Sequence, residues 1–202
     1  MKAPEVAILC ARRDSVYKTI GGCDVYDADR NAFSFDGKAP TVAHPPCRMW
    51  GRLRKMAKGS QVERALAPWC VLMVRECGGV LEHPAQSSLF KHMGLPRPGQ
   101  APDVYGGWTL AISQFWFGHR AEKPTWLYIC GISPRDIPEL PYQMGQPSRV
   151  ITNKKGLRSG MPGFRKECTK SEREHTPATL AHWLVELARK TQNSGPITEA
   201  VA

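Results

Sequence analysis

Three polar sites in this 202-residue chain follow short apolar runs, where the ends of strands would bring them together. The first is Cys47, held on a stiff turn by two preceding prolines, whose rings fix their own φ angles. The second is Glu82, two residues before a proline, and the third is the polar turn 118–125. Open α/β sheets bind ligands at the edge where parallel strands end. A thiol, a carboxyl group and a basic turn at one such edge could supply a nucleophile, an acid and a cation.

Each of these side chains also has an ordinary structural interpretation. Cys47 could be an inert buried thiol, and Glu82 could be a strand-end carboxylate in a salt bridge. His44 could tune or deprotonate Cys47, or it could be a strand histidine bonded to the backbone. His83 and His119 are expected to be hydrogen-bonded structural residues, so no metal site is predicted.

The chain is strongly basic, with 28 Lys+Arg residues against 18 Asp+Glu residues and a formal net charge of +10. This excess favours a polyanionic partner, with nucleic acid ahead of a membrane surface; a basic protein without an anionic ligand is the alternative. Apolar residues make up 42% of the chain, which is typical of a globular domain with a core. The seven cysteines include no C-x-x-C pair, so neither a disulfide framework nor a zinc knuckle is expected.

No apolar run approaches the roughly 20 residues that span a bilayer, and residues 1–5 do not resemble a signal peptide. We therefore expect a cytoplasmic protein without a membrane partner, and a monomer is favoured.

Apolar runs and helical stripes alternate along the chain, which predicts an α/β fold. Strands are expected near residues 6–10, 23–27, 39–44, 80–82, 106–115 and 126–130. Helices are expected near 14–19, capped by Asp14 or Ser15, and at 63–76, and 84–105 is expected to be a long loop. The last two strands are joined by a polar turn, which predicts an antiparallel hairpin on the edge of a mostly parallel, Rossmann-like sheet.

A single compact domain is expected to consist of four segments. Residues 1–132 form a Rossmann-like catalytic core, and 133–175 form a basic loop or arm. Residues 176–190 form a C-terminal helix that packs on the core, and 191–202 form a flexible tail.

Two basic segments could contact a phosphate backbone, although exposed loops are the alternative. The first follows Cys47, and the second lies in the arm 133–175. Their candidate DNA-binding residues are Arg48, Arg52, Arg54, Lys55, Lys154, Lys155 and Arg158.

Asp27 and Asp29 follow the second predicted strand, where a Rossmann fold delivers a carboxylate to a ribose. The first turn lacks the G-x-G-x-x-G pattern, and a local Asx turn is the alternative.

The order and spacing of the three polar sites resemble those of the DNA cytosine-5 methyltransferases. Residues 44–47 (His-Pro-Pro-Cys) are similar to the G-P-P-C nucleophile loop of that family, and 81–84 (Leu-Glu-His-Pro) to its F-E-N-V strand end. The turn 118–125 is similar to its Q-x-R-x-R turn, with Lys123 and Thr125 in the arginine places and Arg120 nearby. The chain also resembles small phage-type proteins of this kind.

This resemblance implies a trimmed methyltransferase-like fold and chemistry on a cytosine flipped out of DNA. The Cys47 thiolate would add to carbon 6, Glu82 would protonate ring nitrogen 3, and Lys123 and Arg120 would offset the developing charge. Carbon 5 would then take a methyl group from S-adenosylmethionine, with Asp14, Asp27 and Asp29 as the implied donor-binding residues.

The chain departs from the family in two places. Residues 10–17 contain no glycine where the donor-binding turn is glycine-rich, and only the arm 133–175 could stand in for a target-recognition domain. Arg12 and Arg13 could instead hold a phosphate or carboxylate of a different donor.

Three functions therefore stay open. The chain could be a DNA methyltransferase-like enzyme, a donor-independent base-altering enzyme of the glycosylase or deaminase kind, or a catalytically inactive DNA-binding protein that masks sites.

Overall fold

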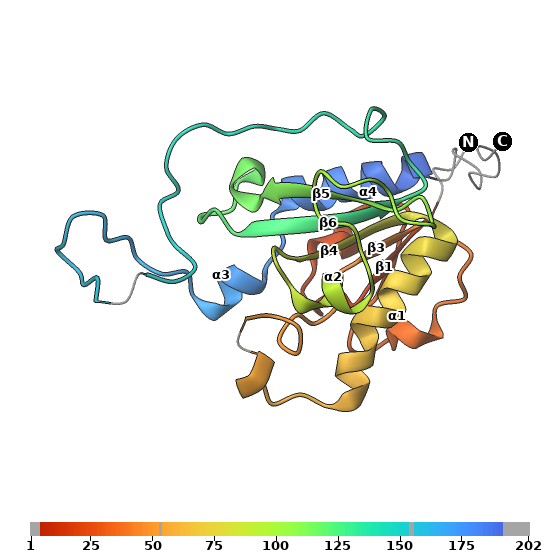
Figure 1. Ribbon diagram of the computed structural model, residues 1–202, viewed down its shortest axis with the longest axis horizontal. Coiled ribbons are helices and arrows are strands. Elements are labelled where there is room, and N and C mark those ends of the chain that lie inside the picture. The colour runs from red at the N-terminus through yellow and green to blue at the C-terminus, as the bar shows by residue number, and fades with distance from the viewer. Residues whose placement is uncertain (1–4, 53, 154–155, 192–202) are drawn as a thin grey trace.

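The computed structural model describes residues 5–52, 54–153 and 156–191 and contains one mixed sheet of six strands, in the order β2-β1-β3-β4-β6-β5 (Figure 1). Four neighbouring strands are parallel: β1 (Val6–Leu9), β2 (Cys23–Tyr26), β3 (Thr41–Ala43) and β4 (Gly79–Pro84). β6 (Pro124–Cys130) runs antiparallel to both of its neighbours, β4 and β5 (Trp108–Ser113). The prediction of a single α/β domain, with a mostly parallel sheet and an antiparallel hairpin at its edge, is confirmed.

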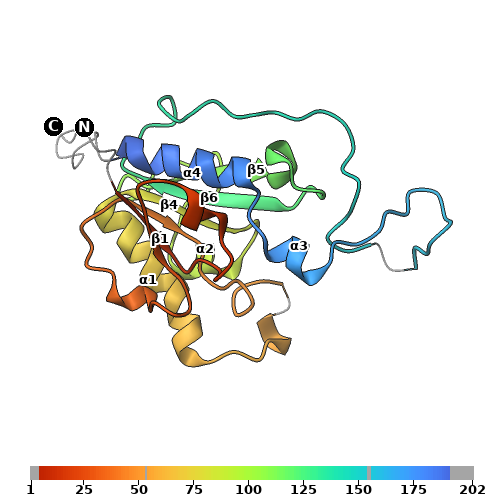
Figure 2. The ribbon, with the colours of Figure 1, turned by 180° about the vertical axis from the view of Figure 1, so that it is seen from behind.

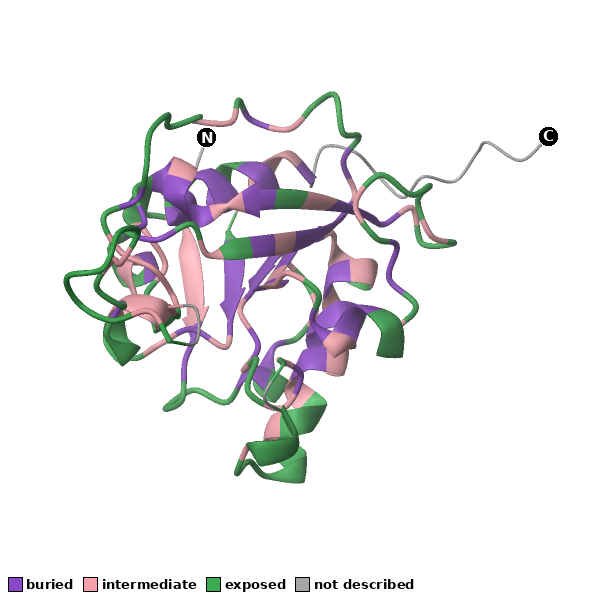
Figure 3. Ribbon diagram, turned by 60° about the vertical axis from the view of Figure 1, so that its left-hand side comes forward, coloured by how far each residue is buried: buried purple, intermediate pink, exposed green. Residues whose placement is uncertain are grey.

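Helices cover both faces of this sheet. α1 (Gln61–Cys77) and α2 (Ser88–His92) lie on the face toward the viewer in Figure 1, and α4 (Ala178–Thr191) lies on the other face, in front in Figure 2. Val6 and Ile8 share a core cluster with α4, whereas Ala7 and Leu9 share one with α1. Because both faces are covered, the inner strands are continuous apolar runs, and Figure 3 shows them buried between the helices.

The start of β4 is fixed by two glycines that follow α1. Gly78 ends the helix with a φ of 75°. Gly79 has a φ of 114°, and a Cβ there would lie 2.0 Å from the carbonyl oxygen of Thr41, so only glycine lets β4 approach β3. The resulting register pairs Ala43 with Leu81, which places the next residue of each strand, His44 and Glu82, side by side at the sheet edge.

Short 3₁₀ helices occupy several connections between strands. The Ser15 hydroxyl accepts a hydrogen bond from the N–H of Tyr17 and caps the first of them, which confirms the predicted short helix. The bounds of these elements are η1 (Val16–Thr19), η2 (Ala32–Ser34), η3 (Arg54–Met56) and η4 (Gln114–Phe117).

Two connections contain helices that the sequence patterns did not predict. The segment 84–105 holds α2, whose Leu89 and Phe90 are buried against the α1 layer. The predicted strand 106–115 ends at Ser113, and η4 follows. Both helices are one turn or little more, which is too short for a 3.6-residue periodicity to be visible.

The segment 133–175 is tied to the core at several points along its length. The Trp183 indole N–H of α4 donates to the carbonyl oxygen of Glu139, and the Arg149 N–H donates to the carbonyl oxygen of Arg120. Residues 150–153 and 156–168 project from the body of the molecule, and α3 (Lys170–Glu174) then returns to the sheet edge (Figure 1). Apart from Thr191, the predicted tail 191–202 lies outside the described residues.

Helix α4 confirms the predicted C-terminal helix that packs on the core. In the part of the chain that the structure describes, no helix combines the length and the apolar character needed to cross a bilayer.

Candidate active site

A cavity of about 630 Å³ opens at the edge where β1, β3 and β4 end. Its walls come from the turns after these three strands, from the start of β6 and from α3. Because β6 runs antiparallel to β4, its first residues return to the edge at which β4 ends, and Thr125 pairs with Pro84 there. The volume lies within the roughly 300–1,000 Å³ that is usual for small-molecule sites.

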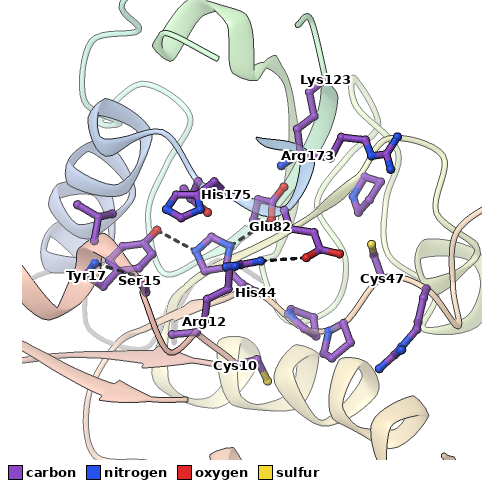
Figure 4. A pocket seen from close by; sticks show the side chains of 18 of the residues that line it. Cys10, Arg12, Ser15, Tyr17, His44, Cys47, Glu82, Lys123, Arg173 and His175 are labelled. Atoms are coloured by element: carbon purple, nitrogen blue, oxygen red, sulfur yellow. Dashed lines mark hydrogen bonds and ion pairs between the residues drawn. The ribbon is translucent and has the colours of Figure 1, made fainter. Parts of the chain in front are cut away.

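The cavity brings together three of the residues to which the sequence patterns assigned chemistry, namely Cys47, Glu82 and Lys123 (Figure 4). Each comes from a different strand end. Their meeting results from the parallel run of β3 and β4 and from the reversed direction of β6.

Glu82 is held at both oxygens by side chains from other elements. His44 Nδ1 lies 3.1 Å from Oε2, and the Gln114 Nε2 amide donates to Oε1 over 2.9 Å. The Glu82 side chain is 14% exposed. Burial alone would raise the pKa of this carboxyl, but the His44 hydrogen bond and the Lys123 charge outweigh it and lower the pKa to about 2. Glu82 is therefore ionised in the empty site.

His44 also contacts the hydroxyl of Tyr17, which lies 2.8 Å from Nε2. Burial raises the pKa of Tyr17 well above its usual value, so this hydroxyl keeps its proton. With Glu82 ionised, the Nδ1 contact is favourable only if Nδ1 carries a proton, which leaves Nε2 of a neutral His44 to accept from Tyr17. The His44 ring thus bonds to two side chains rather than to the backbone, and it joins the turn after β1 to the end of β4.

The Cys47 thiol lies at the opposite side of Glu82 from Tyr17 in the view of Figure 4. The N–H groups of Trp50 and Gly51 both donate to the Cys47 carbonyl oxygen and fix the turn after the two prolines. Desolvation raises the pKa of this thiol, and so does the negative charge of Glu82, whereas the charge of Lys123 lowers it. Cys47 is therefore a protonated thiol in the empty site, although the residue as a whole is exposed.

Two residues of the cavity have left-handed backbone without being glycine. Among the described residues, three non-glycine residues have a positive φ, and two of these line the cavity: Cys10, at 60°, and Lys123, at 39°. Such conformations cost about 1–3 kcal/mol each and concentrate at functional sites. Cys10 adopts its strained conformation in the turn after β1. This turn contains no glycine, although the donor-binding pattern expected there is glycine-rich.

Helix α3 forms a wall of the cavity that sequence reasoning missed. Its Lys170, Arg173 and Glu174 line the cavity, as does His175 directly after it. Glu174 accepts a hydrogen bond from Arg12, 2.9 Å away in the turn after β1. The available signal was the capping box formed by Thr169 and Glu172, which begins this helix.

Arg120 does not line the cavity, although the resemblance placed it in the catalytic group. Its guanidinium pairs with Glu172 at 2.8 Å and holds α3 to the turn before β6. His119 supports the same contact, since its Nε2 lies 3.0 Å from the Glu172 carbonyl oxygen. The prediction of a structural, hydrogen-bonded His119 is confirmed. The same prediction for His83 is wrong, because both ring nitrogens of this buried residue lack a partner in the described structure, and burial lowers its pKa to about 4.

None of the three carboxylates predicted to bind a donor lines the cavity. Asp14 pairs with Arg12 at 2.9 Å, and Asp29 pairs with Arg13 at 2.7 Å.

Asp27 forms the local turn that was its alternative interpretation. Its side chain accepts from the N–H groups of Asp29 and Arg30 and pairs with Lys18 at 2.6 Å. The Lys18 hydrogen bond, followed by the two backbone bonds, lowers the pKa of Asp27 to about 2.

One of the predicted DNA-binding residues lies at the cavity. Arg48 lines the cavity and pairs with Glu63. The remaining described candidates are exposed: Arg52, Arg54, Lys55 and Arg158. Lys154 and Lys155 lie outside the described residues.

No group of three or more His, Cys, Asp or Glu side chains in the described part of the chain is arranged to hold a metal ion. No family model matches the chain, and neither the curated proteins nor the solved structures contain a match. A function must therefore be inferred from the site itself.

Proposed function

We propose that this protein is a DNA-modifying enzyme that acts at carbon 5 of a flipped cytosine through a transient adduct with Cys47. The observation that carries the proposal is the meeting of Cys47, Glu82 and Lys123 in one cavity. A thiol, a carboxyl group and a cation are the three groups that addition to a pyrimidine ring requires.

The addition step assigns a separate task to each group. The Cys47 thiol first gives its proton to solvent. The thiolate then forms a bond to carbon 6, and the π electrons of the 5,6 double bond shift to join carbons 4 and 5. The π electrons between carbon 4 and nitrogen 3 move onto nitrogen 3, which takes a proton from Glu82. Lys123 offsets the negative charge that develops on the ring and on Glu82. The product has a nucleophilic carbon 5.

The fold and the surface are compatible with this reaction. A Rossmann-like, trimmed methyltransferase-like sheet would bind its substrate at the carboxyl edge of the parallel strands, where the cavity lies. DNA is the polyanion that the net charge of +10 favours. Arg48, which lines the cavity, and the exposed cations that follow it in the chain would contact the phosphates beside the flipped base.

S-adenosylmethionine is the simplest methyl donor for carbon 5, but the residues assigned to it do not fit. Asp14, Asp27 and Asp29 do not line the cavity. The carboxylates that line it besides Glu82 are already paired, Glu63 with Arg48 and Glu174 with Arg12. This observation favours a second candidate, an enzyme that alters the flipped base without a methyl donor.

Both candidates form a covalent adduct with Cys47, and trapping of this adduct tests that shared step. Wild-type protein should form a covalent complex with duplex DNA that contains 5-fluorocytosine, and Cys47→Ser should form none. Cys23→Ser is a matched control, because Cys23 is a half-buried thiol of β2 that does not line the cavity. An equal yield of complex from Cys47→Ser would contradict the proposal.

Two further measurements separate the candidates. Mass spectrometry of nucleosides from cells that express the protein distinguishes methylation from another modification. Calorimetry that detects S-adenosylmethionine binding dependent on Asp27 would eliminate the donor-independent candidate. Salt-dependent DNA binding that survives combined Cys47→Ala and Glu82→Ala substitution, with unchanged nucleosides, would instead indicate an inactive DNA-binding protein.

A further inference from the structure

A chain of hydrogen bonds crosses the cavity wall and ends on the proposed acid. Tyr17 Oη lies 2.8 Å from His44 Nε2, and His44 Nδ1 lies 3.1 Å from Glu82 Oε2. The three residues come from η1, from the end of β3 and from β4. The second oxygen of Glu82 is held by the amide of Gln114, which has no acidic proton to give. His44 is thus the titratable group directly bonded to Glu82.

The addition to cytosine requires a distribution of protons that the empty site does not have. Nitrogen 3 must receive a proton through Glu82 while Cys47 is a thiolate. In the empty site the proton is on Cys47, whose pKa is raised, and Glu82 is ionised with a pKa of about 2. Among the described residues, no hydrogen bond joins the Cys47 thiol to Glu82, whereas the His44 ring is bonded to Glu82 directly and can hold a proton.

We propose that His44 supplies this proton, so that the acid of the site is the His44–Glu82 pair rather than Glu82 alone. The inference rests on the proposed addition of Cys47 to cytosine. When His44 is an imidazolium, the Nδ1–H bond breaks and the proton passes to Oε2 of Glu82. Glu82 passes a proton to nitrogen 3 of the base as the bond between sulfur and carbon 6 forms. His44 is left neutral and Glu82 ionised, so charge and protons balance.

The surroundings of His44 allow both of its protonation states. A hydroxyl can donate and accept, so Tyr17 can donate to Nε2 of the neutral ring or accept from Nε2–H of the imidazolium. Glu82 stabilises the imidazolium by its charge. Because His44 acts on the base through Glu82, it is a relay and positioning residue. The similar G-P-P-C loop has a glycine at this position, so the relay is a feature of this chain's own sequence.

Other charged groups of the cavity face the same space. Arg12 and Glu174 compensate each other as an ion pair, whereas the charge of Lys123 acts on both Glu82 and Cys47. Among the described residues, His175 is the one other imidazole that lines the cavity, and no hydrogen bond links its ring to Glu82. Any test must therefore separate His44 from His175.

Exchange of the hydrogen on carbon 5 with deuterated solvent measures the addition without a donor. The adduct accepts a deuteron at carbon 5 and then loses the original proton and the thiolate, which leaves a heavier deoxycytidine. With full-length protein and duplex DNA, the rate should rise by about tenfold per pH unit while His44 stays charged, because more Cys47 is thiolate. A relay that must be charged adds a break to this profile, at which the rate levels off, since loss of the relay proton then offsets the gain in thiolate.

His44→Gln keeps a hydrogen-bond donor to Glu82 but cannot hold the relay proton. We expect its exchange rate at neutral pH to fall by at least about 10²-fold and its pH profile to lose the break. His175→Gln should keep the break. His182→Gln, on the exposed face of α4, is the control for the loss of any imidazole, and it should match the wild type. An unchanged break in His44→Gln, or a break lost only in His175→Gln, would overturn the relay.

Nitrogen NMR of the wild-type protein tests the relay even if His44→Gln does not fold. Nδ1 should keep its proton at every pH, while Nε2 loses its proton as the pH rises. A bare Nδ1 facing Glu82 would overturn the inference. If the wild type showed no exchange at all, the proposed function would fail and the relay with it. Exchange with an unaltered profile in His44→Gln would reject the relay alone.

Discussion

The two halves of the sheet edge end their strands with carboxylates but use them in opposite ways. Near the end of β4, Glu82 accepts one hydrogen bond at each oxygen, from His44 and from Gln114. Each carboxylate oxygen can accept two, so Glu82 retains capacity toward the cavity. After β2, Asp27 accepts from two backbone N–H groups of its own turn and from Lys18, and it does not line the cavity.

This difference indicates which half of the site is built for chemistry. A carboxylate saturated by its own turn stabilises a loop, whereas one that is clamped by other elements and still faces a cavity can act on a ligand. The half formed by β3, β4 and β6 has the second arrangement. The half formed by β1 and β2 has the first arrangement. We therefore place the proposed base in the half formed by β3, β4 and β6, in more detail than we place any donor.

Among the substitutions that test this comparison, removal of the cation beside Glu82 should have the largest effect on the exchange rate. Lys123→Met should lower the rate of carbon-5 hydrogen exchange by about 10²-fold, because the developing negative charge loses its compensation in the cavity. The same substitution should raise the pKa values of Glu82 and Cys47, both of which the Lys123 charge lowers.

Arg120→Met is the matched control for the loss of a nearby cation. Arg120 pairs with Glu172 on the surface and does not line the cavity, and such exposed pairs contribute about 0–1 kcal/mol to stability. Its exchange rate should stay close to that of the wild type. Equal losses in both variants would show that the two cations belong to one catalytic group.

Asp27→Asn should affect stability and leave the base-binding half intact. The pKa of Asp27 is depressed to about 2 in the folded protein, against about 3.9 for an unfolded chain. Its ionised form therefore stabilises the fold above about pH 4, and that stabilisation is lost as the pH falls toward 2. The variant should have a lower Tm at pH 7, and the difference in Tm should shrink between pH 5 and pH 2.

The exchange rate of Asp27→Asn decides what the loss of stability means. An unchanged rate agrees with a purely structural Asp27. A variant that folds normally at neutral pH but has lost exchange or S-adenosylmethionine binding would place Asp27 in the functional site and remove the contrast between the two halves.

The sequence patterns predicted the parallel strands and the edge hairpin because each buried strand is a short apolar run bounded by turn residues. They also predicted that Cys47, Glu82 and Lys123 would share an edge, since strand ends and a reversed strand fix that placement by topology alone. These inferences need only the direction of each strand.

The remaining features depend on contacts between segments that are distant in the chain. The pairing of His44 with Glu82 requires the β3–β4 register that Gly79 permits. The wall formed by α3 depends on Glu172 and Glu174 meeting arginines more than fifty and more than a hundred residues away, respectively. No periodicity within α3 carries that information, since the helix has five residues.

The smallest expected effect concerns Cys10, the left-handed residue in the turn after β1. A residue with a Cβ in this conformation costs about 1–2 kcal/mol, and the greater flexibility of glycine when unfolded offsets about 0.5–1 kcal/mol of any gain. In urea denaturation, the free energy of unfolding of Cys10→Gly should therefore be up to about 1 kcal/mol higher than that of Cys10→Ala. Comparison with Cys10→Ala removes the effect of the sulfur, which lies 3.8 Å from that of Cys70.

Ala11→Gly provides the matched control for that comparison, because Ala11 is the next residue of the same turn and has no positive φ. There the change from alanine to glycine should lower the free energy of unfolding by about 0.5–1 kcal/mol, so the two neighbouring sites should respond with opposite signs. A loss at both positions would mean that Cys10 is not strained. The turn after β1 would then not share backbone strain with Lys123, which directly precedes β6. The two halves of the sheet edge would differ in their backbone as well as in their side chains.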